Sequence, residues 1–384
     1  MSIEKSFCIL PFTHLATHPD GKVTPCCESK LWSSDGTDNL LLGVSDLQSI
    51  RTSKNFNELR NDMLNGRLNE TCNFCYDREK AGLDSKRTRE NIKYEIDYGN
   101  IDKYKSLPLE SIELRLGNIC NAKCVICHPF ASSKWNEDIT DEIRAIDEGY
   151  SKAVIENTWF RDNDFYESLL EKSDQIKHIW FNGGEPLLIK EHLAFLNKLT
   201  ELNITQNIEL EYHTNGTLIT SNIIKLWQKF KFVKITLSLD DILDRYHYAR
   251  FPLTFDKVEN AIELLKINDI YYDIIPTINL LNVYNTTNIY EYFNNKYDKV
   301  CRFNYLRFPK FQSIVNLPEK IKIEILQDSR LPKNLYEELK YELYSVEGDG
   351  LIKAVNFYRT LDKQRGVNLE EYLPEWKNYL VDHE

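Results

Sequence analysis

The sequence predicts an α/β protein built around a parallel sheet, and three observations support this class. Six short runs rich in β-branched and aromatic residues follow one another from about residue 110. The segments between these runs carry apolar residues at helical spacing. Strand and helix therefore alternate along the chain, which is typical of either an open doubly wound sheet or an incomplete barrel.

The predicted strands alternate between apolar and polar residues. The first strand places Glu113 and Arg115 on its polar face, and the third places Glu211 and His213 there. Helices cover the outside of such a sheet, so the polar faces point into a shared interior. We interpret this interior as a chamber for a polar cofactor and substrate, with internally paired salt bridges as the structural alternative. The six predicted strands cover 110–118, 176–184, 208–216, 232–240, 271–279 and 301–309.

Helical periodicity is clearest in two segments. In 131–146, Trp135 and Ile143 fall on one face, and in 254–266 the first residue, Thr254, can cap the helix. A charged insertion follows the first of these helices, and we expect the last 67 residues of the chain, 318–384, to be helical.

Charge and composition narrow the possible partners. The chain of 384 residues has a net charge of -11, which argues against nucleic-acid binding because phosphates need a basic face. No apolar run reaches the ~18 residues that span a bilayer, and the N-terminal apolar stretch is too short for a signal peptide. We therefore expect a cytoplasmic protein without a membrane partner. In that reducing compartment, its nine cysteines are more often metal ligands or catalytic groups than disulfides.

Three cysteines follow the first predicted strand. Cys120, Cys124 and Cys127 have the spacing C-x3-C-x2-C. In a parallel barrel this loop lies at the C-terminal mouth, where active sites gather. Three thiolates can hold three irons of a [4Fe–4S] cube and leave the fourth open for an external ligand. An open coordination position is the usual mark of a catalytic metal site.

The second predicted strand ends in the motif G-G-E-P. Gly183 and Gly184 allow a ligand to approach the backbone closely. Glu185 supplies a carboxylate, and Pro186 stiffens the turn into the next helix. Backbone carbonyls and the Glu185 carboxylate could hold an amino-acid ammonium group at this turn.

Together and in this order, the two motifs resemble those of the radical S-adenosylmethionine (SAM) superfamily. The resemblance spans about 110–310 and implies a partial (β/α)6 TIM-like barrel. It implies that the three cysteines hold a [4Fe–4S] cluster whose open iron is chelated by SAM. Gly183, Gly184 and Glu185 would contact the methionyl amine, and Pro186 would belong to the same SAM-binding turn. In this family the reduced cluster splits SAM into methionine and a 5′-deoxyadenosyl radical, which abstracts a hydrogen atom from the substrate.

Further positions match the family less strictly. Ile126 stands where members often have an aromatic residue that packs on adenine, and Asp241 stands where a glycine is common. Lumen packing or loop capping is the alternative role of the other matching positions. The resemblance assigns SAM or substrate contacts to Asn215, Ser238, Asp240, Arg250 and Asn279.

Four cysteines near the N-terminus predict a second cluster. Residues 13–27 read as a β-hairpin that returns Cys26 close to Cys8, and Cys72 and Cys75 add a C-x2-C pair. The spacing from Cys8 through Gly21 to Cys26 resembles the twitch module, the single-cluster relative of the SPASM domain. It implies an auxiliary [4Fe–4S] cluster held by these four cysteines, although a zinc site is the alternative for four thiolates.

The remaining cysteines and histidines carry weaker predictions. Cys27 could replace Cys26 as a ligand or donate a hydrogen atom, and a packed thiol is the simpler interpretation. Cys301 is predicted to be a buried core residue. His14, His18 and His128 lie near cluster cysteines in sequence and could act as donors around them.

These predictions divide the chain into three parts. They are an auxiliary-cluster module over 1–109, a radical SAM partial barrel over 110–310 and a helical C-terminal extension over 311–384. We expect hydrogen abstraction from a polar small molecule, such as a sugar, an aminocyclitol or a nucleotide, with net oxidation assisted by the auxiliary cluster. Peptide modification is the alternative activity, and an electron-transfer protein with two clusters is the alternative class. The reductase would be a flavodoxin or ferredoxin, and Glu113, Arg115, Glu211 and His213 are the candidate substrate contacts.

Overall fold

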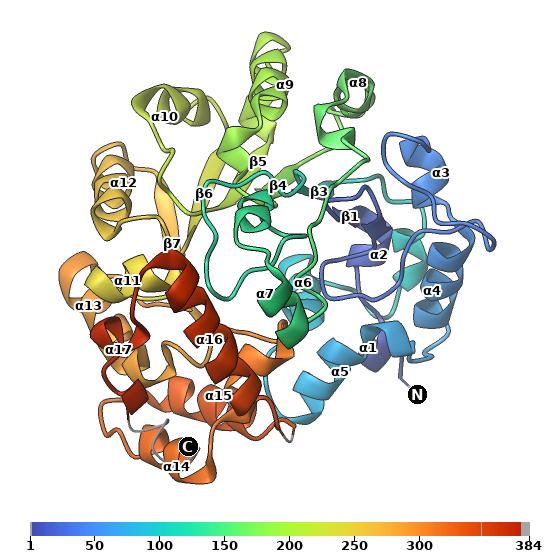
Figure 1. Cartoon of the computed structure of the whole chain (residues 1–384). Coiled ribbons are helices and arrows are strands. Elements are labelled where there is room, and N and C mark those ends of the chain that lie inside the picture. Colours follow the sequence, from blue (N-terminus) through green and yellow to red (C-terminus); the bar gives the residue numbers. More distant parts are fainter. Residues whose placement is uncertain (1, 347, 378–384) are drawn as a thin grey trace. The chain divides into compact units, whose positions relative to one another are not determined.

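The computed structural model describes residues 2–346 and 348–377 (Figure 1). The chain divides into two compact units, each assembled from several segments. Of the described residues, the first unit comprises 2–117, 155–212 and 222–234, and the second comprises 118–154, 213–221, 235–346 and 348–377. Each unit is described separately below.

The first unit contains the cysteine-rich N-terminal region and the start of the main sheet. Its elements are α1 (Ile3–Ser6), α2 (Leu10–Thr13), β1 (His14–Thr17), β2 (Val23–Thr24), α3 (Leu47–Arg51), α4 (Lys54–Leu64), α5 (Asn73–Lys80), α6 (Lys86–Lys93), β3 (Ser111–Arg115), α8 (Asn163–Leu170), β4 (His178–Asn182), α9 (Lys190–Glu201), most of β5 (Glu209–Thr214), most of α10 (Ser221–Trp227) and the start of β6 (Phe232–Ser238).

The strands of the main sheet follow the order β2-β1-β3-β4-β5-β6-β7. β1 pairs with β2 in an antiparallel hairpin, whereas the β1–β3, β3–β4 and β4–β5 pairs are parallel. The predicted hairpin is confirmed, since Gly21 has a φ of 87° at the turn between β1 and β2. The N-terminal module therefore contributes β1 directly to the sheet beside β3.

Helix α9 covers the apolar face of two neighbouring strands. The His192 ring contacts the Phe181 ring of β4 and the Tyr212 ring of β5, with centroid distances of 4.8 and 5.8 Å. Figure 1 shows β4 and β5 side by side, with α9 beside them. This arrangement places the polar residues of these strands on the face opposite α9.

The second unit contains the three-cysteine loop and the C-terminal helices. Its core joins both regions, because Val125 of the loop packs in the same hydrophobic cluster as Phe357, Leu361 and Trp376. The predicted helical C-terminal region is confirmed over its described residues, whereas 347 and 378–384 lie outside them. The elements are α7 (Asp141–Ile146), the end of β6, α11 (Leu243–Ala249), α12 (Phe255–Ile267), β7 (Tyr271–Ile275), β8 (Thr277–Ile278), α13 (Thr286–Tyr297), β9 (Asn304–Tyr305), α14 (Glu319–Leu326), α15 (Lys333–Leu343), α16 (Leu351–Arg365) and α17 (Leu369–Tyr372).

Two predicted elements differ from the structure. The helix predicted over 131–146 is divided into a 3-10 turn, η3 (Ser133–Glu137), and α7, with Asp138 between them. The Asp138 carboxylate pairs with Lys123 and Arg365, and these tertiary contacts hold it outside the helix. The sixth strand is shorter than predicted, because only Asn304 and Tyr305 pair with β8.

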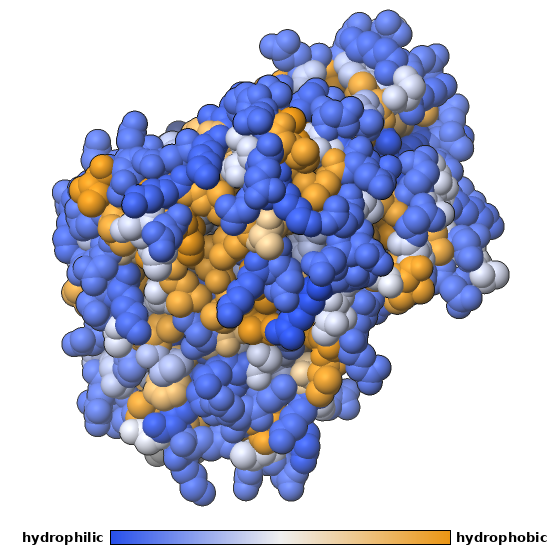
Figure 2. Space-filling model, turned by 90° about the horizontal axis from the view of Figure 1, so that it is seen from above, coloured by the Kyte–Doolittle hydropathy of each residue, from blue (hydrophilic) through white to orange (hydrophobic). Residues whose placement is uncertain are grey.

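The α/β class with a parallel sheet is confirmed by this arrangement. Hydrophilic residues cover most of the face shown in Figure 2, with smaller hydrophobic patches among them. Among the described residues, no helix combines the length and the apolar character needed to cross a membrane.

Asp241 stands where a glycine is common in the family that the sequence resembles. Its contacts link the end of β6 to the C-terminal segment. Its carboxylate is 1% exposed, accepts hydrogen bonds from Asn285 and the Ile242 backbone, and pairs with Arg245 at 2.9 Å. Arg245 in turn pairs with Glu375 at 2.6 Å. A charged residue at position 241 therefore fixes a contact that a glycine could not make.

We predict that Asp241→Ala lowers the free energy of unfolding by about 3 kcal/mol, because it removes one partner of a buried ion pair. Asp244→Ala is the matched control, since Asp244 is exposed on the adjacent helix α11 and its loss should cost about 0.5 kcal/mol or less. Denaturant unfolding of both variants measures the difference. Equal stability of the two variants would contradict this role of Asp241.

Candidate active site

The three-cysteine loop follows β3 and belongs to the second unit. Cys124 is buried, and Cys120 and Cys127 are partly exposed. Burial raises the pKa of the Cys127 thiol above its ordinary value, and the nearby thiols of Cys124 and Cys120 raise it further. The three cysteines therefore lie near enough for their charges to interact, and their binding of a cluster stays a prediction. Binding to a metal must displace their protons, since the thiolate is the ligand.

The loop backbone is held by side chains from distant parts of the second unit. Four of its carbonyl groups each accept a hydrogen bond from a different side chain. The pairs are Lys123 with Arg365 at 2.8 Å, Cys124 with Trp135 at 2.9 Å, Val125 with Gln312 at 3.1 Å and Cys127 with Tyr150 at 2.9 Å.

Two amide groups of the loop also have backbone partners. The Lys123 amide donates to the Phe251 carbonyl and the Val125 amide donates to the Ala249 carbonyl, at 2.8 and 2.9 Å. A loop that runs through the core needs such partners for its polar backbone. These bonds fix the backbone from which the thiols project.

Asn215 contacts the loop as well. Its amide nitrogen donates to Asn121 at 2.8 Å, and its oxygen accepts from the Thr217 backbone and hydroxyl. Asn121 lies between Cys120 and Cys124, so Asn215 supports the cysteine loop through this neighbour. Its predicted contact with SAM stays a prediction.

Arg250 and Asp240 form a buried ion pair beside the thiols. Arg250 Nη1 lies 3.1 Å from Asp240 Oδ2, and both side chains are largely buried. Burial alone would lower the pKa of Arg250, but Asp240 and the thiols of Cys124 and Cys120 raise it above its ordinary value. The Nε atom of Arg250 is buried and has no hydrogen-bond partner among the described residues. An anionic group at this position would satisfy it.

The other positions predicted to contact SAM have different surroundings. Asn279 is buried and bonds to the Thr277 carbonyl and the Leu281 amide, so its side chain shapes the turn after β8. Ser238 is the last residue of β6, and Ile126 is partly exposed within the cysteine loop.

The G-G-E-P turn lies at the end of β4 in the first unit. Gly183 has a φ of 126°, and a Cβ atom there would lie 2.8 Å from the Leu116 nitrogen. Only glycine therefore allows the turn to pack against the end of β3. Glu185 is 1% exposed and accepts a hydrogen bond from the Leu187 backbone at 3.2 Å. Pro186 begins the 3-10 turn Pro186–Leu188 that leads into α9.

The candidate substrate residues of the first unit are paired with neighbouring side chains. Glu113 is buried, accepts a hydrogen bond from Asn182 at 2.9 Å and lies 3.6 Å from both Lys86 and Arg115. Glu211 accepts a hydrogen bond from Trp180 at 2.6 Å. These contacts match the salt-bridge alternative for the polar faces. His213 is exposed.

A polar cavity nevertheless lies at the start of these strands. It encloses about 750 Å³, including space open to solvent. The residues on its strand side are His14, Ser111, His178, Trp180 and Glu209.

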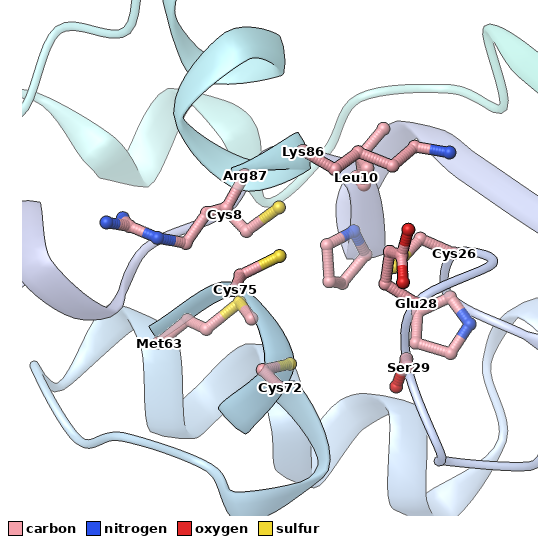
Figure 3. Close-up of a pocket in the computed structure, with 12 residues that line it drawn as sticks. Cys8, Leu10, Cys26, Glu28, Ser29, Met63, Cys72, Cys75, Lys86 and Arg87 are labelled. Atoms are coloured by element: carbon pink, nitrogen blue, oxygen red, sulfur yellow. The ribbon is translucent and has the colours of Figure 1, made fainter. Parts of the chain in front are cut away.

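The four N-terminal cysteines line one cavity of about 400 Å³, together with Leu10, Pro11, Met63, Lys86 and Arg87. Figure 3 shows the sulfur atoms of Cys8, Cys72 and Cys75 facing this space, with Cys26 on its other side. Burial raises the pKa of the Cys8 thiol, and the proximity of Cys26, Cys72 and Cys75 raises it further.

This donor set suits a cluster better than one metal ion. A single Zn²⁺ draws four thiolates to one point, whereas each thiolate of a cube binds a different iron. Four thiols around one largely apolar cavity fit the cube.

The other cysteine and histidine predictions have mixed outcomes. Cys301 is buried as predicted. Cys27 is absent from the lining of the four-thiol cavity and accepts a hydrogen bond from Lys86. The histidines make contacts with other groups: His14 bonds to Ser111, His18 packs on Trp32, and His128 packs on Phe308.

Comparison with known families agrees with this geometry. Residues 114–288 match the Radical SAM superfamily, and residues 8–76 match the SPASM family, described as an iron-sulfur cluster-binding domain. Residues 114–288 therefore carry a radical SAM domain and residues 8–76 a SPASM-type iron-sulfur domain, and the predicted resemblance is confirmed. The cofactors of the chain are SAM and [4Fe–4S] clusters, one of them auxiliary.

The similar proteins include enzymes that mature other proteins. The cysteine-type anaerobic sulfatase-maturating enzyme of Clostridium perfringens strain 13 is 25% identical over 294 residues, which cover 66% of this chain and 75% of that enzyme. A probable GTP 3′,8-cyclase of Methanocella arvoryzae is 25% identical over 174 residues, covering 42% of this chain and 48% of that protein.

A solved structure, that of hexahistidine-tagged anSMEcpe with bound AdoMet, is 24% identical to this chain, with a TM-score of 0.44. The match covers 60% of this chain and 58% of that structure. This chain therefore spans less than two thirds of the structure that it matches.

We predict that Arg365→Met weakens iron retention at the three-cysteine loop, because it removes the donor to the Lys123 carbonyl and the partner of Asp138. After anaerobic reconstitution, this variant should lose iron to a chelator several-fold faster than the parent. Lys363→Met is the matched control on the same helix, since Lys363 is exposed. Equal rates of iron loss for all three proteins would show that these two contacts of Arg365 are not needed to retain iron.

Proposed function

We propose that this enzyme abstracts a hydrogen atom from a residue of a polypeptide substrate and that the modification is a net oxidation. The observation that carries the proposal is the pairing of a three-thiol loop, which leaves one iron open, with a separate four-thiol cavity in the same chain. The cluster and SAM supply the radical chemistry when bound.

Each group of residues has a defined role in this proposal. Cys120, Cys124 and Cys127 hold the SAM-binding cluster, and Arg250 offers its unpaired Nε to an anionic group beside it. Gly183, Gly184 and Glu185 hold the methionyl amine. The remaining SAM contacts are assigned, as in the sequence analysis, to Ile126, Pro186, Asn215, Ser238, Asp240 and Asn279.

The polypeptide substrate replaces the small molecule that we first expected. The sulfatase-maturating relative matches over 75% of its length, whereas the nucleotide enzyme matches over 48%. The longer match favours the peptide alternative. The candidate contacts for the polar backbone of a peptide are Arg115 and His213. Glu113 bonds to Asn182 and Glu211 bonds to Trp180, so we assign these two carboxylates to the wall of the chamber.

The auxiliary cluster would be held by Cys8, Cys26, Cys72 and Cys75. Four thiolates saturate a cube, so this cluster would transfer electrons and would not bind substrate directly. A flavodoxin or ferredoxin would supply the electron that the three-cysteine site needs.

We predict two separable sets of iron. Replacing Cys120, Cys124 and Cys127 by alanine should leave about four irons per chain, and replacing Cys8, Cys26, Cys72 and Cys75 should also leave about four. Iron and sulfide analysis after anaerobic reconstitution measures both. Zinc, or no metal, in the first variant would contradict the auxiliary cluster.

We predict that a peptide stimulates SAM cleavage. A synthetic peptide with a central cysteine should raise the rate of 5′-deoxyadenosine formation about tenfold over the rate without substrate, and deuterium placed on its cysteine side chain should appear in 5′-deoxyadenosine. GTP is the comparison substrate. Stimulation by GTP without stimulation by any peptide of a cysteine- and serine-containing series would contradict the proposed substrate class.

A further inference from the structure

Lys86 links the four-thiol cavity to the polar face of the sheet. It lines the cavity, although its side chain is only 9% exposed. Its ammonium group donates to Cys27 Sγ at 3.0 Å and lies 3.6 Å from Glu113 Oε2. It also lies 4.3 Å from the centre of the Trp180 ring, which is close enough for a cation–π interaction. Figure 3 shows Lys86 above the cavity from α6.

The position of this lysine in its helix is electrostatically unfavourable. Lys86 and Arg87 are the first two residues of α6, which Ser85 caps. The N-terminus of a helix carries partial positive charge and favours anions. Two buried cations at this end break the usual rule, and such local violations tend to mark functional sites.

The two cations are compensated to different extents. Arg87 forms a direct ion pair with Glu79 through two nitrogens and also donates to the Phe7 carbonyl. The carboxylate that forms an ion pair with Lys86 is Glu113, which is beyond hydrogen-bond distance from Nζ and is shared with Arg115 and Asn182. The Oε2 atom of Glu113 is buried and has no hydrogen-bond partner among the described residues. The charge of Lys86 is therefore only partly offset by the protein.

An anion in the cavity would complete this compensation. A cube held by four thiolates is anionic, and the gain of one electron makes it one unit more negative. A nearby buried cation stabilises the more negative state, and charge near a cluster is one of the factors that set its reduction potential.

We propose that Lys86 is a positioning residue that raises the reduction potential of the auxiliary cluster, so that the oxidised cluster accepts the electron that the substrate radical loses in the proposed net oxidation. This inference rests on the auxiliary cluster of the proposed function. Glu113 acts in the opposite sense, because its negative charge faces the same ammonium group and lowers the potential.

The test uses the full chain with Cys120, Cys124 and Cys127 replaced by alanine, so that only the auxiliary cluster is observed. Electron paramagnetic resonance during reductive titration measures its midpoint potential. Lys86→Met should shift this potential to a more negative value, and Lys86→Arg should restore it toward that of the parent. Glu113→Gln should shift it to a more positive value.

Arg89→Met is the matched control, because Arg89 is exposed on the same helix, and it should leave the potential unchanged. The inference is overturned if the Lys86→Met variant binds full iron and its midpoint potential is unchanged. It is also overturned if Lys86→Met and Glu113→Gln shift the midpoint potential in the same direction. If Lys86 had only a structural role, Lys86→Met and Glu113→Gln would not be expected to shift the midpoint potential in opposite directions. If Lys86→Met does not assemble the cluster, the positive shift in Glu113→Gln decides the question. Absence of iron in the parent would instead refute the auxiliary cluster itself.

Discussion

The cysteine loop depends on side chains that hold its backbone in place. Four of its carbonyl groups, those of Lys123, Cys124, Val125 and Cys127, accept hydrogen bonds from side chains that come from η3, α16 and the segments around Tyr150 and Gln312. Buried carbonyl groups without partners would cost about 1–3 kcal/mol each. The C-terminal helices therefore have a definite role, since they hold the radical SAM loop of the second unit.

The two thiol sites differ in a way that matches their chemistry. The buried Arg250–Asp240 pair lies beside the three-thiol loop. The Nε atom of Arg250 has no hydrogen-bond partner among the described residues and can bind a further anionic group. The four-thiol cavity has its own hydrophobic core around Phe7, Leu59 and Met63. An open site suits ligand binding, whereas a closed and largely apolar site suits electron transfer with little reorganisation.

Sequence reasoning succeeded where function depends on local spacing. The C-x3-C-x2-C and G-G-E-P motifs and the hairpin around Gly21 are short patterns whose geometry follows from a few residues. It failed where distant residues decide the outcome. The break at Asp138 depends on Arg365, which lies 227 residues away in the chain. The pairing of Glu113 with Lys86 joins β3 to α6, and no periodicity in either segment indicates it.

The central claim is that one chain holds an open cluster that binds SAM and a closed cluster that does not. Electron paramagnetic resonance of the reduced protein, recorded with and without SAM, tests this claim most directly. Because only the open iron can accept a new ligand, SAM should change the spectrum of one cluster and leave the other unchanged. A spectrum that does not respond to SAM, or a response of both clusters, would contradict the account.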